Sequence, residues 1–300
     1  MKISLAPIPY FWPRDQVHAF YGRALEWPVD IVYLGEVVCS KRRELTLDDW
    51  LHIAETLAGR GKEVVLSSLA LIEAESELAV LRRIVENGRY PVEANDMAAV
   101  QLLFGRGAFV IGPHINVYNE HTLALLAQRG ACRWVIPVEL GREQVRILSE
   151  RRPAGLEIEL FAYGRLPLAF SSRCFSARAH NRPKDDCGLI CGEFPEGMPL
   201  RTREGRPFLV LNGVQVQSAA VNNLLDYVPE FAACGIDIVR ISPRVEGTGE
   251  VLAAFREALS GRAPADSPSI RDEPGALCCD GYWQGRAGKS WESGRNGGWT

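Results

Sequence analysis

Four of the eight cysteines in this 300-residue chain have a spacing that could hold a metal. Cys39 stands alone, and Cys174, Cys187 and Cys191 follow in the pattern C-x12-C-x3-C. Four thiolates are the ligand set of an iron–sulfur cluster or of a structural zinc ion. Structural zinc sites usually pair their ligands two to four residues apart, and here only Cys187 and Cys191 do so. The spacing therefore favours a cluster and leaves zinc, or unrelated thiols, as alternatives.

Basic residues flank both parts of this cysteine set. They are Lys41, Arg42 and Arg43 near Cys39, and Arg173, Arg178, Arg182 and Lys184 near the other three. Positive charge lowers the pKa of a thiol and would offset the negative charge of a ligated cluster. The other cysteines fit a structural role: Cys132 precedes a core strand and Cys234 ends a helix, which is typical of buried thiols. Cys278 and Cys279 are assigned no role.

Short apolar runs alternate with amphipathic stretches along most of the chain. The runs are rich in β-branched residues and bounded by Gly, Pro or Asn, so we expect buried parallel strands at 3–6, 30–34, 63–67, 90–93, 108–111, 133–136, 155–159 and 236–241. Thr46 begins a capping-box helix that ends near Gly59, Asn95 and Asn119 are expected to cap later helices, and two more helices are expected at about 218–233 and 248–260. Eight strand–helix units predict an α/β fold of the (β/α)8, TIM-barrel-like type, with a doubly wound open sheet as the alternative.

The expected barrel occupies residues 1–261 and contains one abnormally long connection after its seventh strand. This insert, 161–217, carries three of the four cysteines and a hairpin pattern over 208–217 with Asn212-Gly213 at its turn. Residues 262–300 form an irregular tail rich in Gly, Pro, Ser and Trp. Loops that follow barrel strands share one face, so an insert of this length can bring its cysteines to Cys39, which lies five residues beyond the second strand.

Composition limits the class of protein. The net charge of −3 and the pI near 6.0 argue against a nucleic-acid binder. The beginning of the chain lacks the apolar core of a signal peptide, and no apolar run approaches the length of a transmembrane segment. We therefore expect a soluble, cytoplasmic protein. In that compartment its cysteines favour metal binding over disulfides.

Polar residues at the expected strand ends form a candidate substrate pocket. Glu93 ends the fourth strand, His114 and Asn116 follow the fifth, and Arg240 lies in the eighth. In a barrel these positions meet at the face where active sites gather, and together they could bind an aromatic or carboxylate substrate. The alternative is that they form internal ion pairs or support loops.

One segment, from the end of the seventh strand into the insert, resembles a known signature. Glu159-x-Phe161-x-x-Gly164, a few apolar positions and then Ser171-x-x-Cys174 are similar to the pattern of the U32 peptidase-like (collagenase-like) family. The stretch 174–191 and the surroundings of Cys39 resemble one branch of that family, which serves oxygen-independent ubiquinone biosynthesis. Further similarity at 112–119 and 281–288 extends the resemblance over nearly the whole chain. Many family members have a second cysteine in the signature where this chain has Pro167.

The resemblance implies a [4Fe–4S] cluster on Cys39, Cys174, Cys187 and Cys191. It also implies a heterodimer with a homologous subunit, a sterol-carrier-like accessory protein in the same pathway, and a role in hydroxylating a ubiquinone precursor without O2. Glu159 and Tyr163 join the candidate pocket because they lie on the signature, with an ion pair or a loop anchor as the alternative. No catalytic residue is assigned.

Two other functions stay open. The chain could be a U32-type peptidase with a structural metal, although it shows no Ser-His-Asp, Cys-His or HExxH arrangement that would support proteolysis. It could also be a non-catalytic subunit whose cluster organises the interface with its partner.

Overall fold

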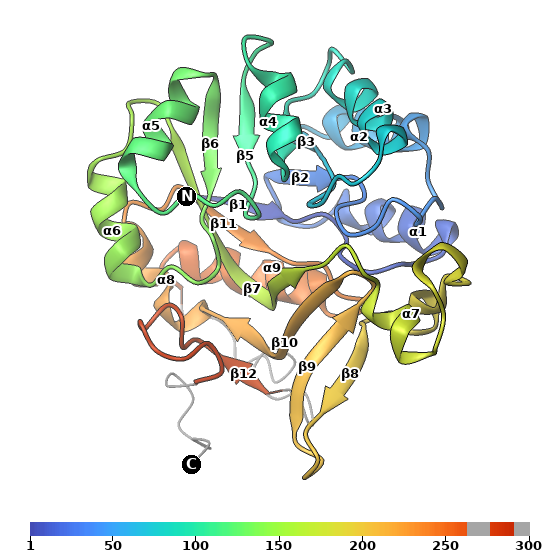
Figure 1. Ribbon diagram of the computed structural model, residues 1–300. Coiled ribbons are helices and arrows are strands. Elements are labelled where there is room, and N and C mark those ends of the chain that lie inside the picture. Colours follow the sequence, from blue (N-terminus) through green and yellow to red (C-terminus); the bar gives the residue numbers. More distant parts are fainter. Residues whose placement is uncertain (263–276, 291–300) are drawn as a thin grey trace.

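A computed structural model of the chain describes residues 1–262 and 277–290. Eight parallel strands close into a barrel, because β11 pairs with both β1 and β7 (Figure 1). The barrel strands are β1 (Lys2–Leu5), β2 (Ile31–Leu34), β3 (Glu63–Ser67), β4 (Val92–Ala94), β5 (Phe109–Ile111), β6 (Ala131–Val135), β7 (Glu157–Phe170) and β11 (Ile238–Ile241). The predicted (β/α)8 fold is confirmed, and the open doubly wound sheet is excluded.

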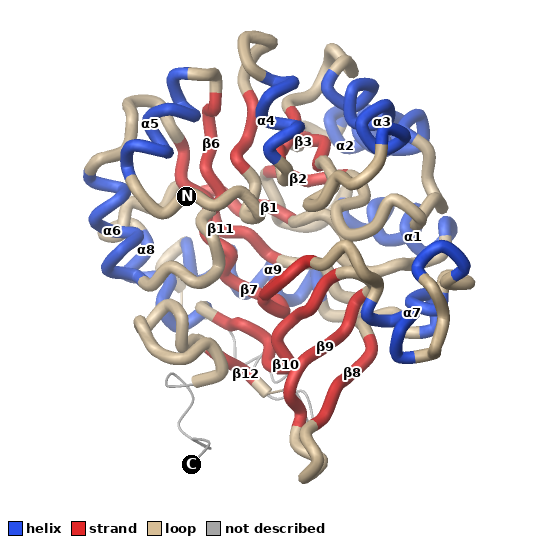
Figure 2. Tube along the Cα trace, in the orientation of Figure 1, coloured by secondary structure: helices blue, strands red, loops and turns tan. Residues whose placement is uncertain are grey.

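Helices surround the barrel and cover its outer face (Figure 2). They are α1 (Arg14–Ala24), α2 (Leu47–Gly59), α3 (Glu75–Val85), α4 (Met97–Leu103), α5 (Glu120–Gln128), α6 (Arg142–Glu150), α8 (Val228–Phe231) and α9 (Thr248–Leu259). Their apolar sides pack on the outward residues of the strands, such as Ile3, Leu5 and Val32. No helix in the described part of the chain is long and apolar enough to cross a membrane.

Helix caps follow the sequence at two of three expected positions. Thr46 and Asp49 form the capping box of α2, and Asn119 caps α5 by accepting a hydrogen bond from the backbone N–H of Thr122. The expectation for Asn95 is wrong, because Asp96 caps α4 by accepting from the N–H of Ala98. Asn95 is instead held inside the barrel mouth.

The helix expected over 218–233 is also wrong. Those residues begin as strand β10 (Gln215–Asn223), continue through a 3-10 turn (Leu225–Tyr227) and reach helical structure only in the short α8. The backbone of β10 pairs with β7 on one side and with β9 on the other, and this pairing overrides the local helical pattern.

The long connection forms an antiparallel extension of the barrel sheet. β7 runs to Phe170, beyond residue 161 where the insert was expected to begin, and pairs with β10. β10 pairs with β9 (Pro207–Asn212), and β9 with β8 (Met198–Arg201). The expected hairpin is present: Gly213 begins its two-residue turn with a φ of 66°, a conformation that favours glycine. α7 (Phe175–Ala179) and the 3-10 turns Lys184–Asp186 and Ile190–Glu193 lie beside this extension (Figure 1).

Part of the expected tail docks onto the barrel. β12 (Cys278–Cys279) pairs in parallel with β10, and buried Trp283 packs edge-on against Phe231 with ring centroids 5.5 Å apart. The carbonyl of Trp283 also accepts from the N–H of Arg142. Trp291 and Trp299 lie outside the described residues.

The Thr46 cap offers a direct test of the local structure. Replacing Thr46 with alanine leaves an N–H at the start of α2 without its partner, so we expect the free energy of unfolding to fall by about 1 kcal/mol. Denaturant titration measures this change. Thr56→Ala is the matched control, because the Thr56 hydroxyl only bonds back to the carbonyl of His52 within the same helix. An equal loss in both variants would contradict the capping argument.

Candidate functional site

The loop after β2 places Cys39 at the barrel mouth. The carboxylate of Glu36 accepts hydrogen bonds from the backbone N–H groups of Val38 and Cys39, at 2.8 and 3.0 Å, and so fixes the turn that presents the thiol. Cys174 lies across the mouth at the start of α7, where its Sγ accepts from the N–H of Ala177 at 3.4 Å. Both cysteines are therefore anchored through the backbone beside them.

The structure brings the predicted cysteine set together. Cys39, Cys174 and Cys187 pack in one apolar cluster with Val38, Ala177, Val214 and Phe170. Cys174 interacts electrostatically with both Cys39 and Cys191, so the fourth cysteine joins the same group. All eight cysteines of the chain are free thiols. We call Cys39, Cys174, Cys187 and Cys191 the thiol site.

Arg42 is the buried cation of the thiol site. It is 5% exposed; its Nη1 donates to the carbonyl of Pro9 at 2.9 Å and its Nη2 donates to Asn212 Oδ1 at 2.7 Å. The Glu36 carboxylate lies 3.9 Å away, and Nε has no hydrogen-bond partner among the described residues. Arg42 also interacts with Cys191. An unpartnered N–H and a positive charge beside sulfur suit an anionic thiolate ligand set.

Burial opposes ionisation of these thiols. It raises the pKa of Cys39 to about 11 and raises the pKa of Cys191, while Arg42 acts in the opposite direction on both. The Cys39 and Cys191 thiols therefore carry protons at neutral pH, and a metal that binds them must displace those protons.

The thiol site does not form a ready pocket for a single ion. Within residues 1–262 and 277–290, no group of three or more His, Cys, Asp or Glu side chains could hold a metal ion as arranged. A four-iron cube separates its four sulfur ligands, so it needs four converging thiols rather than a tight ring around one ion. The donor set, all sulfur with a buried cation beside it, fits such a cluster.

A recess next to the thiol site opens at the carboxyl ends of the barrel strands. Its empty volume is about 490 Å³, including solvent at its mouth. Of the predicted pocket residues, Glu93, His114 and Arg240 line it. Val38 lines the recess and also packs in the thiol site, and Phe170 of the thiol site packs edge-on against His114 at 4.7 Å between ring centroids. The recess and the thiol site therefore share a wall.

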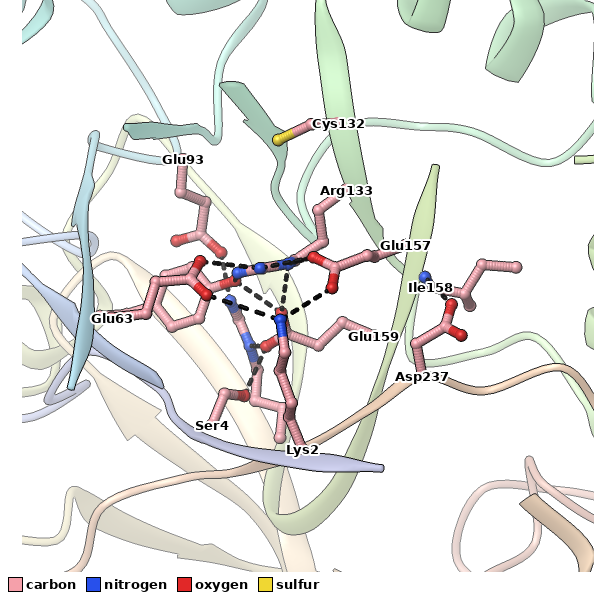
Figure 3. Close-up of polar contacts among 12 residues, drawn as sticks. Lys2, Ser4, Glu63, Glu93, Cys132, Arg133, Glu157, Ile158, Glu159 and Asp237 are labelled. Carbon is pink, nitrogen blue, oxygen red and sulfur yellow. Dashed lines mark hydrogen bonds and ion pairs between the residues drawn. The ribbon is translucent and has the colours of Figure 1, made fainter. Parts of the chain in front are cut away.

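Charged side chains fill the barrel interior (Figure 3), and two of them, Glu93 and Arg240, also line the recess. Arg240 donates from Nη2 to Glu93 and from Nε to Glu159, both at 2.6 Å, and its guanidinium lies over the Tyr33 ring at 4.0 Å. Glu159 also accepts from the hydroxyls of Ser4 and Tyr33, at 2.6 and 2.5 Å. All five side chains are buried. Glu159 is therefore an internal ion-pair partner that lies beneath the recess.

A second ion-pair layer closes the other end of the barrel. Arg133 pairs with Glu63 at 2.8 Å and with Glu157 at 2.6 Å, and Lys2 reaches Glu157 at 3.0 Å (Figure 3). Arg133 Nη1 also donates to the Tyr33 hydroxyl, which joins this layer to the one above. Strand alternation explains both layers, because Glu63, Arg133 and Glu157 occupy inward positions of their strands.

Known proteins share sequence with this chain. The family description "Peptidase family U32" matches residues 20–273. The chain belongs to peptidase family U32. A collagenase of Porphyromonas gingivalis (strain ATCC BAA-308 / W83) is 24% identical over 291 residues, which cover 87% of this chain and 69% of the collagenase.

The solved structures that match this U32 protein have low sequence identity to it. The U32 peptidase Mk0906 has a TM-score of 0.45 and 14% identity, with 82% of this chain and 94% of that chain covered. A dihydropteroate synthase from Thermus thermophilus has a TM-score of 0.39 and 14% identity, with 85% and 93% covered.

The remaining predicted pocket residues lie away from the recess. Tyr163, on the U32 signature, packs against Phe255 of α9, and its hydroxyl accepts from Arg244 Nη1 at 3.3 Å, so it anchors β7 to the outer helix layer. The side chain of Asn116 is exposed on the loop after β5 and does not line the recess. Neither residue lines this recess, and their place in a substrate pocket stays a prediction.

Two residues of the site, Gln215 and Gln217, could be predicted from the sequence only as part of a hairpin. Both are buried and line the recess. Arg42, expected beside Cys39 as a charge that suits a cluster, is buried there, and Asn95, at the end of the fourth strand, is buried and lines the recess. The alternation of β10 was the available signal, since it places Gln215 and Gln217 on one face.

His114 gives the recess a pH-dependent contribution to stability. Burial, aided by the charge of Arg240, lowers the pKa of His114 to about 3, whereas an unfolded histidine titrates near 6.5. The unfolded chain therefore takes up a proton first as pH falls, and this contribution, complete above pH 6.5, is lost between pH 6.5 and 3. Between pH 7 and pH 5 we expect the free energy of unfolding to fall less in His114→Phe than in the parent protein, by on the order of 1 kcal/mol.

Denaturant titrations at the two pH values measure this difference. Phenylalanine keeps the edge-on contact with Phe170 but cannot be protonated. His52→Phe, the same substitution at an exposed position of α2, is the matched control. Identical pH dependence in the His114 variant and the parent protein would contradict a half-buried, neutral imidazole.

Proposed function

We propose that this U32 protein holds a [4Fe–4S] cluster on Cys39, Cys174, Cys187 and Cys191. The convergence of four free thiols from the β2 loop and the β7 extension around Arg42 is the observation that supports the proposal. Their number equals the ligand requirement of the cluster, and the Arg42 charge would offset part of the negative charge of four thiolates.

We further propose a role in ubiquinone biosynthesis. The sequence resembles the branch of family U32 named UbiV, whose members act with the homologous protein UbiU in hydroxylation of the ubiquinone ring without O2. On this proposal the chain is half of a UbiV–UbiU heterodimer, and the sterol-carrier-like protein UbiT is an accessory partner. The overall change is ArH + XO → ArOH + X, in which a donor XO other than O2 supplies the oxygen atom and is itself reduced by two electrons.

The chain's own residues would bind and orient the ring in such a reaction. The bound cluster would supply redox chemistry or Lewis-acid chemistry at the thiol site. Val38 and Phe170, which separate that site from the recess, would keep a ring in the recess close to the cysteines while excluding water. His114 stays neutral at physiological pH and offers an apolar edge rather than a charge. No catalytic residue is assigned.

Anaerobic purification followed by iron, sulfide and zinc analysis tests the cluster. We expect about four iron and four sulfide per chain, with an EPR signal after reduction. Stoichiometric zinc without iron would overturn the cluster assignment. The pathway role is tested by incubating the chain and UbiU with a ubiquinone precursor under anaerobic conditions. A hydroxylated product that requires both proteins supports it, whereas no product with fully loaded protein overturns it.

Two further results would point to the alternative functions. Peptidase activity that survives the loss of all four cysteines would favour a U32-type peptidase, which is the activity that the name of the Porphyromonas gingivalis relative states for that protein. Hydroxylation that survives changes to the recess but not changes to the subunit interface would favour a non-catalytic subunit organised by its cluster.

A further inference from the structure

The antiparallel extension formed by β7, β10, β9 and β8 carries a continuous row of apolar side chains on one face. Residues directly opposite each other on antiparallel strands point to the same side of a sheet. The strand register therefore places seven residues together, in one row of Ala169, Val216, Leu211 and Met198 and a second row of Ser218, Leu209 and Leu200. Six of the seven are apolar. We call these seven residues the extension face.

The extension face reverses the usual pattern of a sheet that has one side in water. Such a sheet normally turns its apolar residues inward and its polar residues outward. Here the inward residues Asn212, Gln215 and Gln217 are polar and at most 3% exposed, whereas none of the seven extension-face residues is buried and Leu200 is 39% exposed. Within the described residues, none of the seven packs against a buried hydrophobic cluster. A contiguous apolar surface of this kind indicates a binding site for another molecule.

The edge of the extension is less suited to binding than its face. β8 ends the sheet, has only four residues and includes Pro199, which has no N–H to donate to a further strand. In Figure 1 the turn between β8 and β9 lies at the far end of the extension, away from the helices of the barrel. A partner can therefore reach the extension face without displacing an element of the described chain.

Positive charge at the end of the extension indicates the chemistry of that partner. Arg201, Arg203 and Arg206 are exposed at the β8–β9 turn, and within the described residues none of them has a carboxylate partner. Glu204 is the one acidic residue of this turn. A protein that presents an apolar patch with an acidic rim is complementary to this surface, whereas a second copy of the chain brings only the same arginines.

The extension face lies on the reverse side of the strands that form the candidate site. β10 alternates residues of the extension face with Gln215 and Gln217, which line the recess. β9 has the same alternation at Asn212, whose Oδ1 accepts from Arg42 of the thiol site at 2.7 Å. A partner on the extension face is therefore separated from the recess and the thiol site by the thickness of one sheet.

We propose that the extension face binds the second subunit of the heterodimer, and that this subunit presents an apolar patch with an acidic rim. The inference rests on the function proposed above, because the partner is the homologous subunit named there. It adds the surface that makes the contact. Binding at this surface holds the strands that carry the recess-lining glutamines and the partner of Arg42, so assembly of the two subunits stabilises the candidate site.

Titration of the full chain with UbiU, followed by calorimetry under anaerobic conditions, tests this surface. Leu200→Glu and Leu211→Glu each place a carboxylate in one row of the extension face, next to the expected acidic rim of the partner. We expect each to weaken the complex at least about tenfold. Leu125→Glu is the matched control, because Leu125 is 53% exposed on α5 and lies outside the extension face. It should leave the affinity unchanged.

Charge reversal tests the acidic rim separately. Arg203→Glu should slow association with UbiU several-fold at low salt, and the difference from the parent protein should shrink as salt screens the charges. Arg83→Glu, at an exposed arginine of α3, is the control and should associate at the rate of the parent protein. Equal association rates for the Arg203 and Arg83 variants would overturn the proposed charge complementarity.

The remaining outcomes separate this inference from the proposed function. A complex that all the extension-face variants retain with parental affinity overturns the surface and leaves the heterodimer intact. No complex between UbiU and the iron-loaded parent chain overturns the proposed partnership, and the surface with it. Light scattering that shows a dimer of the chain alone, lost in Leu211→Glu, would assign the surface to a second copy and overturn the proposal.

Denaturant unfolding of the isolated variants excludes one further occupant. If the surface is open in the isolated chain, Leu200→Glu should unfold at the same denaturant concentration as Leu125→Glu. A markedly lower midpoint for Leu200→Glu would show that another segment of the chain itself covers the extension face, and would overturn the proposal. Iron content measured on the same preparations should match the parent protein in every variant, so that loss of the cluster is not mistaken for loss of the surface.

Discussion

Replacement of Cys39 by alanine is expected to remove the cluster. The iron content should fall from about four atoms per chain towards none. A four-iron cube needs all four thiolates, and the β2 loop offers no other sulfur near this position. The same loss is expected for Cys174→Ala, Cys187→Ala and Cys191→Ala. Iron and sulfide analysis of anaerobically purified variants, with the visible absorbance of the cluster, measures the effect.

Two other cysteines provide matched controls. Cys132 donates its thiol to the carbonyl of Phe109 within the barrel wall, and Cys234 is buried after α8. Cys132→Ala and Cys234→Ala should keep full iron content, with only the modest stability cost of a small buried side chain. Iron content unaffected by Cys39→Ala would show that the β2 loop does not contribute a ligand and that the cluster lies within the β7 extension alone.

The barrel could be predicted because its strands and helices carry local signals. The eight apolar runs coincide with the barrel strands to within a few residues at their starts, and caps at Thr46 and Asn119 were visible in the sequence. The convergence of Cys39 with Cys174 also followed from a general rule, since loops after barrel strands share one face. Closure of β11 onto β7 then fixes which loops meet.

The errors arose where long-range pairing determines local structure. Residues 218–223 show a helical pattern but form a strand, because β7 extends to Phe170 and offers its edge to β10. Asn95 was a reasonable cap candidate, yet Asp96 takes that role and frees Asn95 to bond with Ser68 and Glu93. Neither outcome could be read from neighbouring residues, since each depends on a strand distant in sequence.

The charged interior explains why the recess can be polar at its base. Arg240 and Glu93 line the recess and also belong to the ion-pair layer beneath it. Their mutual pairing satisfies them without a ligand. The thiol site, the recess and the ion-pair layer are therefore stacked along one path, with Arg42 and Arg240 as their cations.

Replacement of Arg240 is expected to lower the stability of the protein more than the other substitutions. Arg240→Met leaves Glu93 and Glu159 buried without their cation and removes the guanidinium from the Tyr33 ring. Breaking a buried ion pair from one side typically costs about 3–5 kcal/mol, because the remaining charge stays in a poorly solvated place. We expect the free energy of unfolding at pH 7 to fall by about that amount in denaturant titration.

Two controls, a surface arginine and a double mutant, test whether the loss of stability comes from the buried ion pairs or from the removal of an arginine as such. Arg146 pairs with Glu143 and Glu150 on the exposed side of α6, and Arg146→Met should cost no more than about 1 kcal/mol, because solvent screens these pairs. Adding Glu93→Gln to Arg240→Met should recover part of the lost stability, since it removes one of the two stranded carboxylates. If Arg240→Met cost less than Arg146→Met, water would have to reach Glu159 through the recess, and the barrel interior would not be the dry ion-pair layer described above.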